Sequence, residues 1–370
     1  MDALKALLSL SLTPGLGPRK IKMLCERFGG AQAVLEAEPE ALREVERVGP
    51  KLIAALTATR DSQKISEEVE KELERAERLK IALLHLEHPD YPDALRQIYD
   101  PPPLLYVRGT LPPMLSQTKA VGIVGTRNAS QYALNLSLNF SRDLSRAGVA
   151  VISGLALGVD SAAHKGAVGS EGGQTVAVLG SGVDVIYPRQ NQRLVEEILD
   201  GHGAVVSEYR IGSGPRATNF PGRNRIINGL SKGVLVVEGG LKSGALITAE
   251  FALEEGRNVF AIPGRVGDRK AEGTLALLKQ GALMVQSASD ILQEFGWREG
   301  GAEKNVVSLT SLEEPGRGVV QVIQKRGSPL LDDLIEATGK TAADLLPTLM
   351  LLELQGVVKL LPGGRYISLI

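Results

Sequence analysis

Uncharged apolar runs alternate with glycine turns and helix-like stretches through the middle of the chain. Residues 120–124 are one such run, Gly125 follows, and a helix-like stretch covers 131–147. Strand, glycine turn and helix in this order begin a doubly wound α/β domain, which binds ligands at the carboxyl ends of its strands. Because the runs do not alternate with polar residues, they predict parallel strands covered on both faces. Similar runs lie at 149–153, 175–179, 204–208, 233–238 and 258–262, and two shorter runs that we expect to extend the sheet lie at 81–86 and 104–108.

The segments on either side follow different patterns. Residues 1–78 predict short helices joined by tight turns, and residues 316–370 predict three helices and a hairpin, as in a winged helix. A stretch rich in glycine and acidic residues, 297–315, predicts a linker. We therefore predict an α/β fold in which residues 79–296 form an extended, doubly wound (Rossmann-like), mostly parallel sheet. A helical domain of the helix-hairpin-helix (SAM-like) type and a winged helix flank this sheet.

Capping residues set the expected bounds of the C-terminal helices. Ser328 and Pro329 match the N-cap and the first position of the second helix, and Thr341 matches the N-cap of a third helix over 342–354. A Pro-Gly-Gly turn within 357–369 predicts the hairpin. The third helix contains acids but no Lys or Arg, so we do not expect it to read DNA bases. This weakens the interpretation of the protein as a sequence-specific regulator.

Composition limits the class of protein. The chain has 370 residues, of which 43% are hydrophobic, enough for two or three domains. Cys25 is the only cysteine, so we expect neither a disulfide nor a thiolate metal site, and a cytoplasmic location fits. A signal-peptide pattern and an apolar run of membrane-spanning length are both missing, so no membrane association is expected. The net charge is −1, so a nucleic-acid site must come from local placement of charge.

Two stretches of the helical segment resemble each other. Residues 12–21 and 45–53 each combine a Gly-Pro turn, a basic residue and an apolar helix. In tandem helix-hairpin-helix units such a turn and the following helix N-terminus hold a DNA phosphate. Alternatively, the Gly and Pro residues only end and begin helices of an αα-hairpin. The second stretch has Arg47 in place of the first glycine of the turn, which weakens the DNA-binding interpretation.

The turn after residues 120–124 offers a candidate phosphate site. Its spacing is Gly122-x-x-Gly125-x-Arg127, so the dinucleotide fingerprint G-x-G-x-x-G is absent. Backbone N–H groups, a helix N-terminus and a guanidinium remain, and these are features that bind phosphate. The alternative is a purely structural glycine turn.

The stretch 219–231 carries the clearest binding signal. From Glu208 to Lys232 the chain contains five basic residues and one acidic residue, and Phe220 lies among them in the sequence. Guanidinium groups bind phosphates, and an aromatic ring stacks on a base, so this combination suits single-stranded nucleic acid. The alternative places Phe220 in the core and leaves the arginines solvated. The candidate DNA-binding residues are Arg127, Lys165, Arg189, Arg216, Phe220, Arg223, Arg225 and Lys242.

Sequence patterns that indicate catalysis are weaker than the pattern that indicates nucleic-acid binding. The four histidines form no metal-ligand spacing, and neither Ser153 nor Ser181 lies in a G-x-S-x-G context. The chain also lacks a Walker A lysine, so we expect no metal, no cofactor and no use of ATP.

Five stretches together resemble the DprA (Smf) family of DNA-processing proteins and span most of residues 80–290. They are residues 125–127, 153–165, 178–188, 220–227 and 242–249. The resemblance implies a cytoplasmic, non-catalytic protein of natural transformation that protects incoming single-stranded DNA and loads RecA onto it. The family's binding residues correspond to Arg127, Arg189 and Phe220 with its basic neighbours. Thr126 replaces the commoner serine, and Arg216 lies one place from the family's lysine.

The same resemblance implies a homodimer. Leu275, Leu278 and Met284 would lie in its two-fold interface, whereas ordinary core packing is the alternative for this apolar stretch.

A second resemblance implies a different function, that of a hydrolase. The loop at Glu238-Gly239-Gly240 is similar to that of nucleotide phosphoribohydrolases, but Leu246 occupies the position of the catalytic Glu. Because Leu can neither stabilise an oxocarbenium ion nor move a proton, hydrolase activity is not expected.

Overall fold

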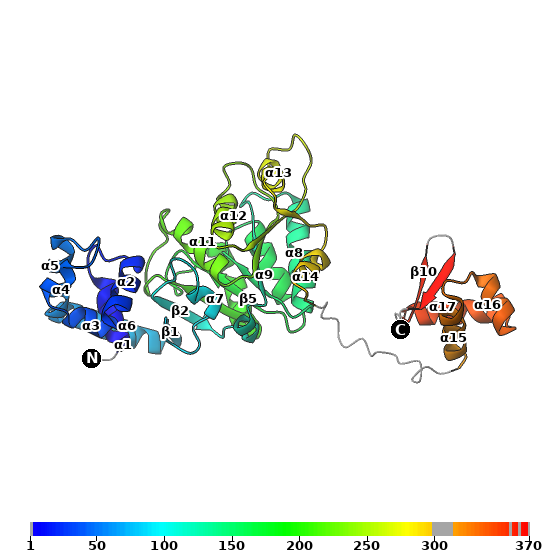
Figure 1. The fold of residues 1–370 in the computed structure, drawn as a ribbon, viewed down its shortest axis with the longest axis horizontal. Helices are drawn as coiled ribbons and strands as arrows, with labels where there is room; N and C mark the ends of the chain where they lie inside the picture. The colour runs from blue at the N-terminus through cyan, green and yellow to red at the C-terminus, as the bar shows by residue number, and fades with distance from the viewer. Residues whose placement is uncertain (1–2, 298–313, 355–356, 362–363, 369–370) are drawn as a thin grey trace. The chain divides into compact units, whose positions relative to one another are not determined.

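The computed structural model describes residues 3–297, 314–354, 357–361 and 364–368 (Figure 1). The chain divides into two compact units, residues 1–299 and 300–370. Most of the predicted linker, 298–313, lies outside the described residues, as do residues 362 and 363 of the predicted hairpin turn.

A nine-stranded sheet organises the first unit. Its strand order is β1-β2-β6-β5-β4-β3-β7-β8-β9. All neighbours from β6 to β9 are parallel, whereas β1 and β2 pair antiparallel with each other and β2 pairs antiparallel with β6. The predicted Rossmann-like, mostly parallel sheet is confirmed. The strands are β1 (Ile81–His85), β2 (Leu104–Gly109), β3 (Ala120–Val124), β4 (Ala150–Ser153), β5 (Thr175–Val178), β6 (Gly203–Ser207), β7 (Gly233–Val236), β8 (Asn258–Ala261) and β9 (Leu283–Met284).

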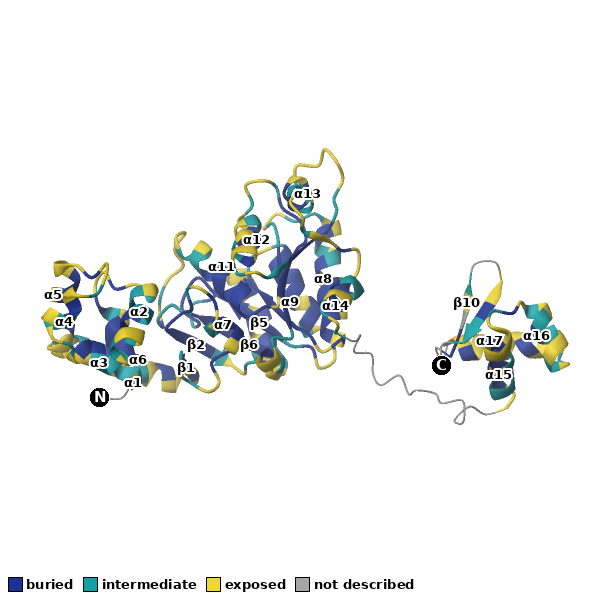
Figure 2. Cartoon of the chain, in the orientation of Figure 1, coloured by how far each residue is buried: buried dark blue, intermediate teal, exposed yellow. Residues whose placement is uncertain are grey.

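Helices cover both faces of this sheet, and its inner strands are buried accordingly (Figure 2). In β3, Val121 and Ile123 belong to one hydrophobic cluster, whereas Ala120 and Val124 belong to another. Alternate residues of a strand point to opposite faces, so an uninterrupted apolar run is what two covered faces require. The helices are α7 (Asp93–Arg96), α8 (Gln131–Arg146), α9 (Val159–Val168), α10 (Gln192–Glu197), α11 (Asn219–Gly229), α12 (Gly244–Glu254), α13 (Glu272–Lys279) and α14 (Ala288–Glu294), with short turns η1 (Pro113–Gln117), η2 (Arg189–Asn191) and η3 (Ile198–His202).

The N-terminal segment is helical, as predicted. Its two similar stretches have nearly identical N-caps: Gly17 has φ −90° and ψ 169°, and Gly49 has φ −89° and ψ 170°. Arg47 has φ 65°, close to the φ of 78° at Gly15, so the arginine adopts the left-handed conformation of the glycine that it replaces. The helices are α1 (Ala3–Leu12), α2 (Pro18–Phe28), α3 (Ala31–Glu36), α4 (Pro39–Arg43), α5 (Pro50–Arg60) and α6 (Gln63–Arg78).

Helix α6 is rich in charged residues but is buried along one face. Val69, Glu72 and Ala76 are buried there. Their spacing of three and four residues places them on one side of the helix. A carboxylate in the middle of a buried stripe needs partners, and these lie in the sheet part of the same unit.

The second unit is a winged helix. It contains α15 (Gly316–Arg326), α16 (Leu331–Thr338), α17 (Ala342–Leu354) and the hairpin β10 (Val358–Leu361) and β11 (Arg365–Ser368). The predicted bounds of α17 are confirmed, but the predicted start of α16 is wrong. Pro329 O accepts a hydrogen bond from Tyr366 N at 2.9 Å, and Leu330 bridges Arg365. The chain is therefore extended beside the wing at Ser328 and Pro329, and the helix begins afterwards.

Candidate nucleic-acid interface

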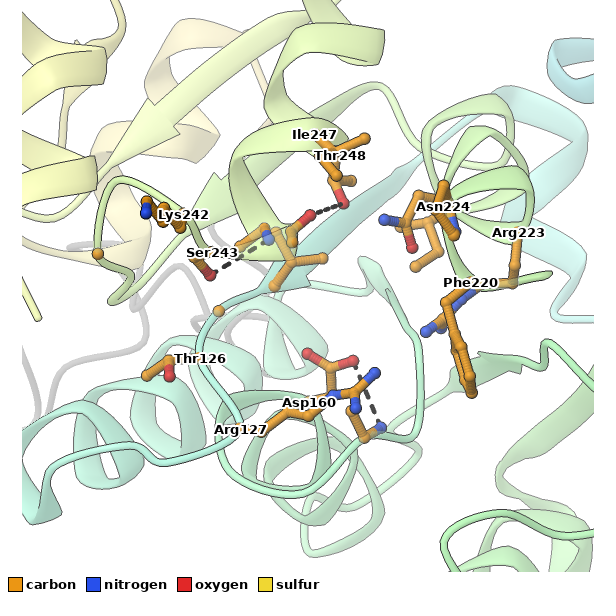
Figure 3. Close-up of a pocket in the computed structure, with 18 of the residues that line it drawn as sticks. Thr126, Arg127, Asp160, Phe220, Arg223, Asn224, Lys242, Ser243, Ile247 and Thr248 are labelled. Carbon is orange, nitrogen blue, oxygen red and sulfur yellow. Dashed lines mark hydrogen bonds between the residues drawn. The ribbon is translucent and has the colours of Figure 1, made fainter. Parts of the chain in front are cut away.

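A pocket of about 480 Å³ opens at the carboxyl ends of β3 and β7 (Figure 3). The β3–α8 turn and the first turns of α9, α11 and α12 line it. The chain runs from β3 to β4 on one side of the sheet order and returns through β7 on the other side of β3. The pocket therefore lies at the topological switch point, where ligands bind in open α/β sheets.

The β3–α8 turn is held by the neighbouring strand. Thr126 N donates to Glu238 O at 2.8 Å. The Glu238 carboxylate accepts from Ser130 N at 2.8 Å and from Ser130 Oγ at 2.6 Å, at the N-terminus of α8. At Gly125 a Cβ atom would lie 2.5 Å from Val159 Cγ2, so only glycine allows this close approach. Because the Glu238 carboxylate already occupies the N-terminus of α8, that helix end does not offer a site for a phosphate. The Arg127 side chain is then the group of this turn that can bind an anion.

Arg127 and two aromatic rings form one cluster. The Arg127 guanidinium lies over the Phe220 ring, 5.2 Å from its centroid, and the Tyr187 ring lies 5.9 Å from Phe220. Arg127 is exposed, Tyr187 is 44% exposed and Phe220 is half-buried, so the cluster is open to a ligand. A guanidinium beside aromatic faces can bind a phosphate while a ring stacks on a base.

Arg223 forms part of the pocket wall. It is only 5% exposed, and its Nη1 donates to Val178 O at 2.8 Å. A Cβ on Gly154 would lie 1.7 Å from Arg223 Nη1, so the guanidinium fills the space that a side chain at Gly154 would need. Burial lowers the pKa of Arg223, and Asp160 opposes that shift. Burial also raises the pKa of Asp160, against the effect of Arg223.

Arg225 is directed away from the pocket. Its Nη2 lies 2.7 Å from Glu208 Oε2, and its Nε lies 3.4 Å from Asp100 Oδ2. The side chain is 10% exposed, so two carboxylates already neutralise a nearly buried cation. The pKa of Arg225 is raised by these two carboxylates, although burial acts in the opposite direction.

Lys242 and the N-terminus of α12 lie on the opposite side of the pocket from Phe220 (Figure 3). Ser243 is the N-cap of α12, and its Oγ accepts from Ala245 N at 3.3 Å. Lys242 is exposed, and none of the ion pairs among the described residues includes it or Arg127. Two free cations and a helix N-terminus thus favour a polyanion here.

The remaining candidates lie outside the pocket lining. Arg189 is exposed at the start of η2, two residues after Tyr187, and Arg216 is exposed in the loop before α11. Lys165 lies in the last turn of α9. A helix that begins at the carboxyl edge of a sheet runs back towards the other edge, which carries Lys165 away from the pocket.

The apolar candidates lie at the β9 end of the sheet. Met284 is 59% exposed on β9, and Leu275 and Leu278 are half-buried on α13. Leu278 also packs against the core cluster of the sheet. Neighbouring Leu283 is 37% exposed, so this edge of the sheet has uncovered apolar surface.

Sequence reasoning missed three features of the pocket. They are the Tyr187 ring beside Phe220, the buried Asp160 and the N-cap Ser243. Ser243 could have been found, because Ser before a small-residue helix is an N-cap signal. The other two depend on contacts between distant segments.

Two observations bear on the metal-site and hydrolase alternatives. No group of three His, Cys, Asp or Glu side chains within the described parts of the chain could hold a metal ion. Leu246, at the position of the hydrolase's Glu, lies against Gly239 and Gly273. Among the helices of residues 3–297 and of the described C-terminal residues, none is both long and apolar enough to cross a membrane.

The fold and the pocket define a Rossmann-like α/β protein with a winged helix and a basic, aromatic pocket at the switch point of its sheet. Residues 82–296 match the family described as DNA recombination-mediator protein A, and residues 317–364 match the DprA winged helix domain. The chain belongs to the DprA (Smf) family, which confirms the resemblance found in the sequence.

Individual relatives support this family assignment. Protein Smf of Synechocystis is 35% identical over 97% of both chains. The X-ray structure of DprA from Streptococcus pneumoniae superposes with a TM-score of 0.67 at 33% identity, covering 80% of this chain and 98% of that one. DprA from Helicobacter pylori, whose structure concerns its single-stranded DNA binding mode, has a TM-score of 0.52 at 29% identity and covers 59% and 96%.

Proposed function

We propose that this protein binds single-stranded DNA in the cytoplasm as a recombination mediator, without catalysis, and delivers the strand to RecA. The observation that carries the proposal is the Arg127–Phe220–Tyr187 cluster at the switch point of the sheet. A single strand offers both the phosphates and the unpaired bases that this cluster suits. Family membership and the single-stranded DNA binding mode of the Helicobacter relative support it.

The residues take different roles in this proposal. Arg127 and Lys242 meet phosphates at the pocket, and Phe220 and Tyr187 stack on bases. Arg189 and Arg216, both exposed, extend the contact along the strand.

The roles of Arg223 and Arg225 are revised from the sequence-based prediction. Both side chains are buried and already have protein partners. Moving either guanidinium to a phosphate would take a donor from Val178 O, or a cation from Glu208 and Asp100. We assign Arg223 to shaping the pocket wall and Arg225 to holding α11 through its two carboxylate partners, and we assign no DNA contact to Lys165.

Binding of labelled oligo-dT and of a mixed-sequence strand over a salt series tests the proposal. Phosphate contacts predict that log K falls with log salt by about 0.7 per contact for a single strand, with little difference between the two sequences. Failure of the intact protein to bind either strand at low salt would contradict the proposal. Released base or cleaved strand in the same incubation would contradict the absence of catalysis.

Delivery to RecA is tested by following RecA filament growth on a long single strand coated with single-strand binding protein. We expect this protein to shorten the lag before filament growth. An unchanged lag, with DNA binding intact, would remove the RecA step and leave the DNA-binding proposal in place.

We further propose that the protein is a homodimer through the β9 end of the sheet. The exposed Met284 and the half-buried Leu275 and Leu278 support this. Light scattering on Leu275→Arg is the test, with Leu253→Arg on the exposed part of α12 as the matched control. Halving of the mass in the first variant alone is expected, whereas an unchanged dimer refutes the interface and aggregation indicates core packing.

A further inference from the structure

The loop between β6 and α11 leads directly to Phe220. Most of its residues from 212 to 218 are exposed, so the loop has little packing of its own. Its buried anchor is Ile211, 7% exposed, at the loop's beginning. The contacts of Arg210 and Ile211 therefore fix one end of the segment that carries the Phe220 ring.

That anchor is held by the N-terminal helices. The Glu72 side chain of α6 is fully buried, and its Oε1 accepts from Ile211 N at 2.9 Å. Its other oxygen lies 3.3 Å from Arg210 Nη2, which also lies 3.3 Å from Glu68 Oε2. Because a buried carboxylate is tolerated only when its partners are in place, these contacts specify one position of the loop relative to α6.

A second carboxylate acts at the other end of the segment. Asp100 Oδ2 lies 3.4 Å from Arg225 Nε on α11 and 3.3 Å from Arg19 Nε on α2. The Arg19 guanidinium also lies over the Tyr99 ring, 4.8 Å from its centroid. One oxygen atom thus joins α11 to the first Gly-Pro turn of the N-terminal helices.

This arrangement reassigns the first hairpin turn. Arg19 follows Gly17 and Pro18, where a helix-hairpin-helix unit would meet a phosphate. Here its guanidinium faces a carboxylate of the same chain. The first hairpin therefore contacts the loop between α7 and β2 through the side chain that a DNA-binding hairpin would direct to a phosphate.

Taking the proposed single-stranded DNA binding as given, we infer that the N-terminal helices position the Phe220 side of the pocket through Glu72 and Asp100, without touching DNA. Glu72 fixes the start of the loop, and Asp100 fixes the helix that follows it. Both are positioning residues that act through the ring of Phe220.

Glu72→Gln keeps the shape and the acceptor for Ile211 N but removes the charge opposite Arg210. We expect about a fivefold loss of oligo-dT affinity, which corresponds to ~1 kcal/mol. The matched control is Glu70→Gln on the same helix, whose carboxylate pairs with Lys5 within the N-terminal helices, and it should bind like the unaltered protein. Arg210→Ala removes the same pair from the loop side and serves if Glu72→Gln fails to fold.

A double-mutant cycle separates positioning from general destabilisation. In a Phe220→Ala background, Glu72→Gln should cause no further loss, because the ring through which it acts is gone. Equal losses in both backgrounds would overturn the inference. Lys51→Ala on the exposed second hairpin should leave binding unchanged, and a tenfold loss there would show that the N-terminal helices touch DNA.

The outcomes distinguish this inference from the proposed function. If the unaltered protein does not bind a single strand, the proposed function fails. If it binds while Glu72→Gln and Arg210→Ala both bind equally well, the inference alone fails.

Discussion

The switch-point pocket and the winged helix differ in what they leave exposed. Arg127 and Lys242 are exposed cations that take part in none of the ion pairs among the described residues. On the winged helix, by contrast, Arg326 pairs with Asp333 and Glu336, and none of the cation–ring contacts among the described residues lies in that unit. Unpaired cations beside an aromatic ring favour a polyanion, whereas paired cations offer it little.

The exposed surface of α17 strengthens the contrast. Leu346, Met350 and Leu351 are 48%, 65% and 57% exposed, and the helix contains no Lys or Arg. The wing's Arg365 donates from Nη1 to Ser328 O at 2.8 Å. Exposed apolar groups gathered on one helix are typical of a protein contact. We therefore propose that DNA binds to the first unit, and the predictions for Arg127 and for residues 314–370 test this.

The largest effect is expected for Arg127→Ala. The variant loses a charged hydrogen bond to phosphate and the cation over Phe220, which together should weaken oligo-dT binding about thirtyfold, or ~2 kcal/mol. The slope of log K against log salt should also fall by about 0.7. Fluorescence anisotropy over a salt series measures both quantities.

Lys165→Ala is the matched control, since this exposed cation lies in the last turn of α9. Its binding should equal that of the unaltered protein. If Lys165→Ala weakens binding as much as Arg127→Ala, the DNA path does not follow the carboxyl edge of the sheet.

The contrast between these two cations shows how far sequence reasoning reaches. The uninterrupted apolar run of β3 and the glycine turn before Arg127 are local, so the chain predicts them directly. The direction of α9 was predictable too, and it should have excluded Lys165. The partners of Arg225 were not predictable, because Asp100 and Glu208 lie 125 and 17 residues away in the sequence. Buried ion pairs depend on tertiary packing that no periodicity reveals.

The second prediction concerns acid sensitivity of the first unit, which contains all four histidines. His164 is fully buried, with Nδ1 2.7 Å from Thr175 Oγ1. Burial, assisted by the charge of Arg223, lowers the pKa of His164 to about 3. The unfolded chain takes up the proton below pH ~6.5, so the stabilisation is present above that pH and is lost as the pH falls towards 3.

Between pH 7 and pH 5.5 this linkage should remove about 1.3 kcal/mol of unfolding free energy. Urea titrations of the unaltered protein and of His164→Gln measure it as a difference in pH dependence, so other titrating groups cancel. His202→Gln, at a half-buried histidine, is the control and should retain the full pH dependence. An identical pH dependence in His164→Gln and the unaltered protein would contradict the buried neutral state of His164.

The smallest effect is expected from deleting residues 314–370. The described part of this segment forms its own compact unit with its own hydrophobic cluster, so its removal should leave the fold of the first unit intact. Asp344 and Glu353 on α17 would be repelled by phosphates, and Gln355, the polar residue after that helix, lies outside the described residues. Single-stranded DNA affinity should therefore change by less than about twofold, or ~0.4 kcal/mol.

The same anisotropy titration measures this affinity, after light scattering has shown that the truncated protein has kept the oligomeric state of the full chain. A tenfold loss, ~1.4 kcal/mol, would place DNA contacts on the winged helix and break the comparison. The truncated protein could instead retain its affinity for DNA and lose its binding to a protein partner. That result would assign the exposed leucines of α17 to the contact with that partner, because exposed apolar surface is typical of a protein contact.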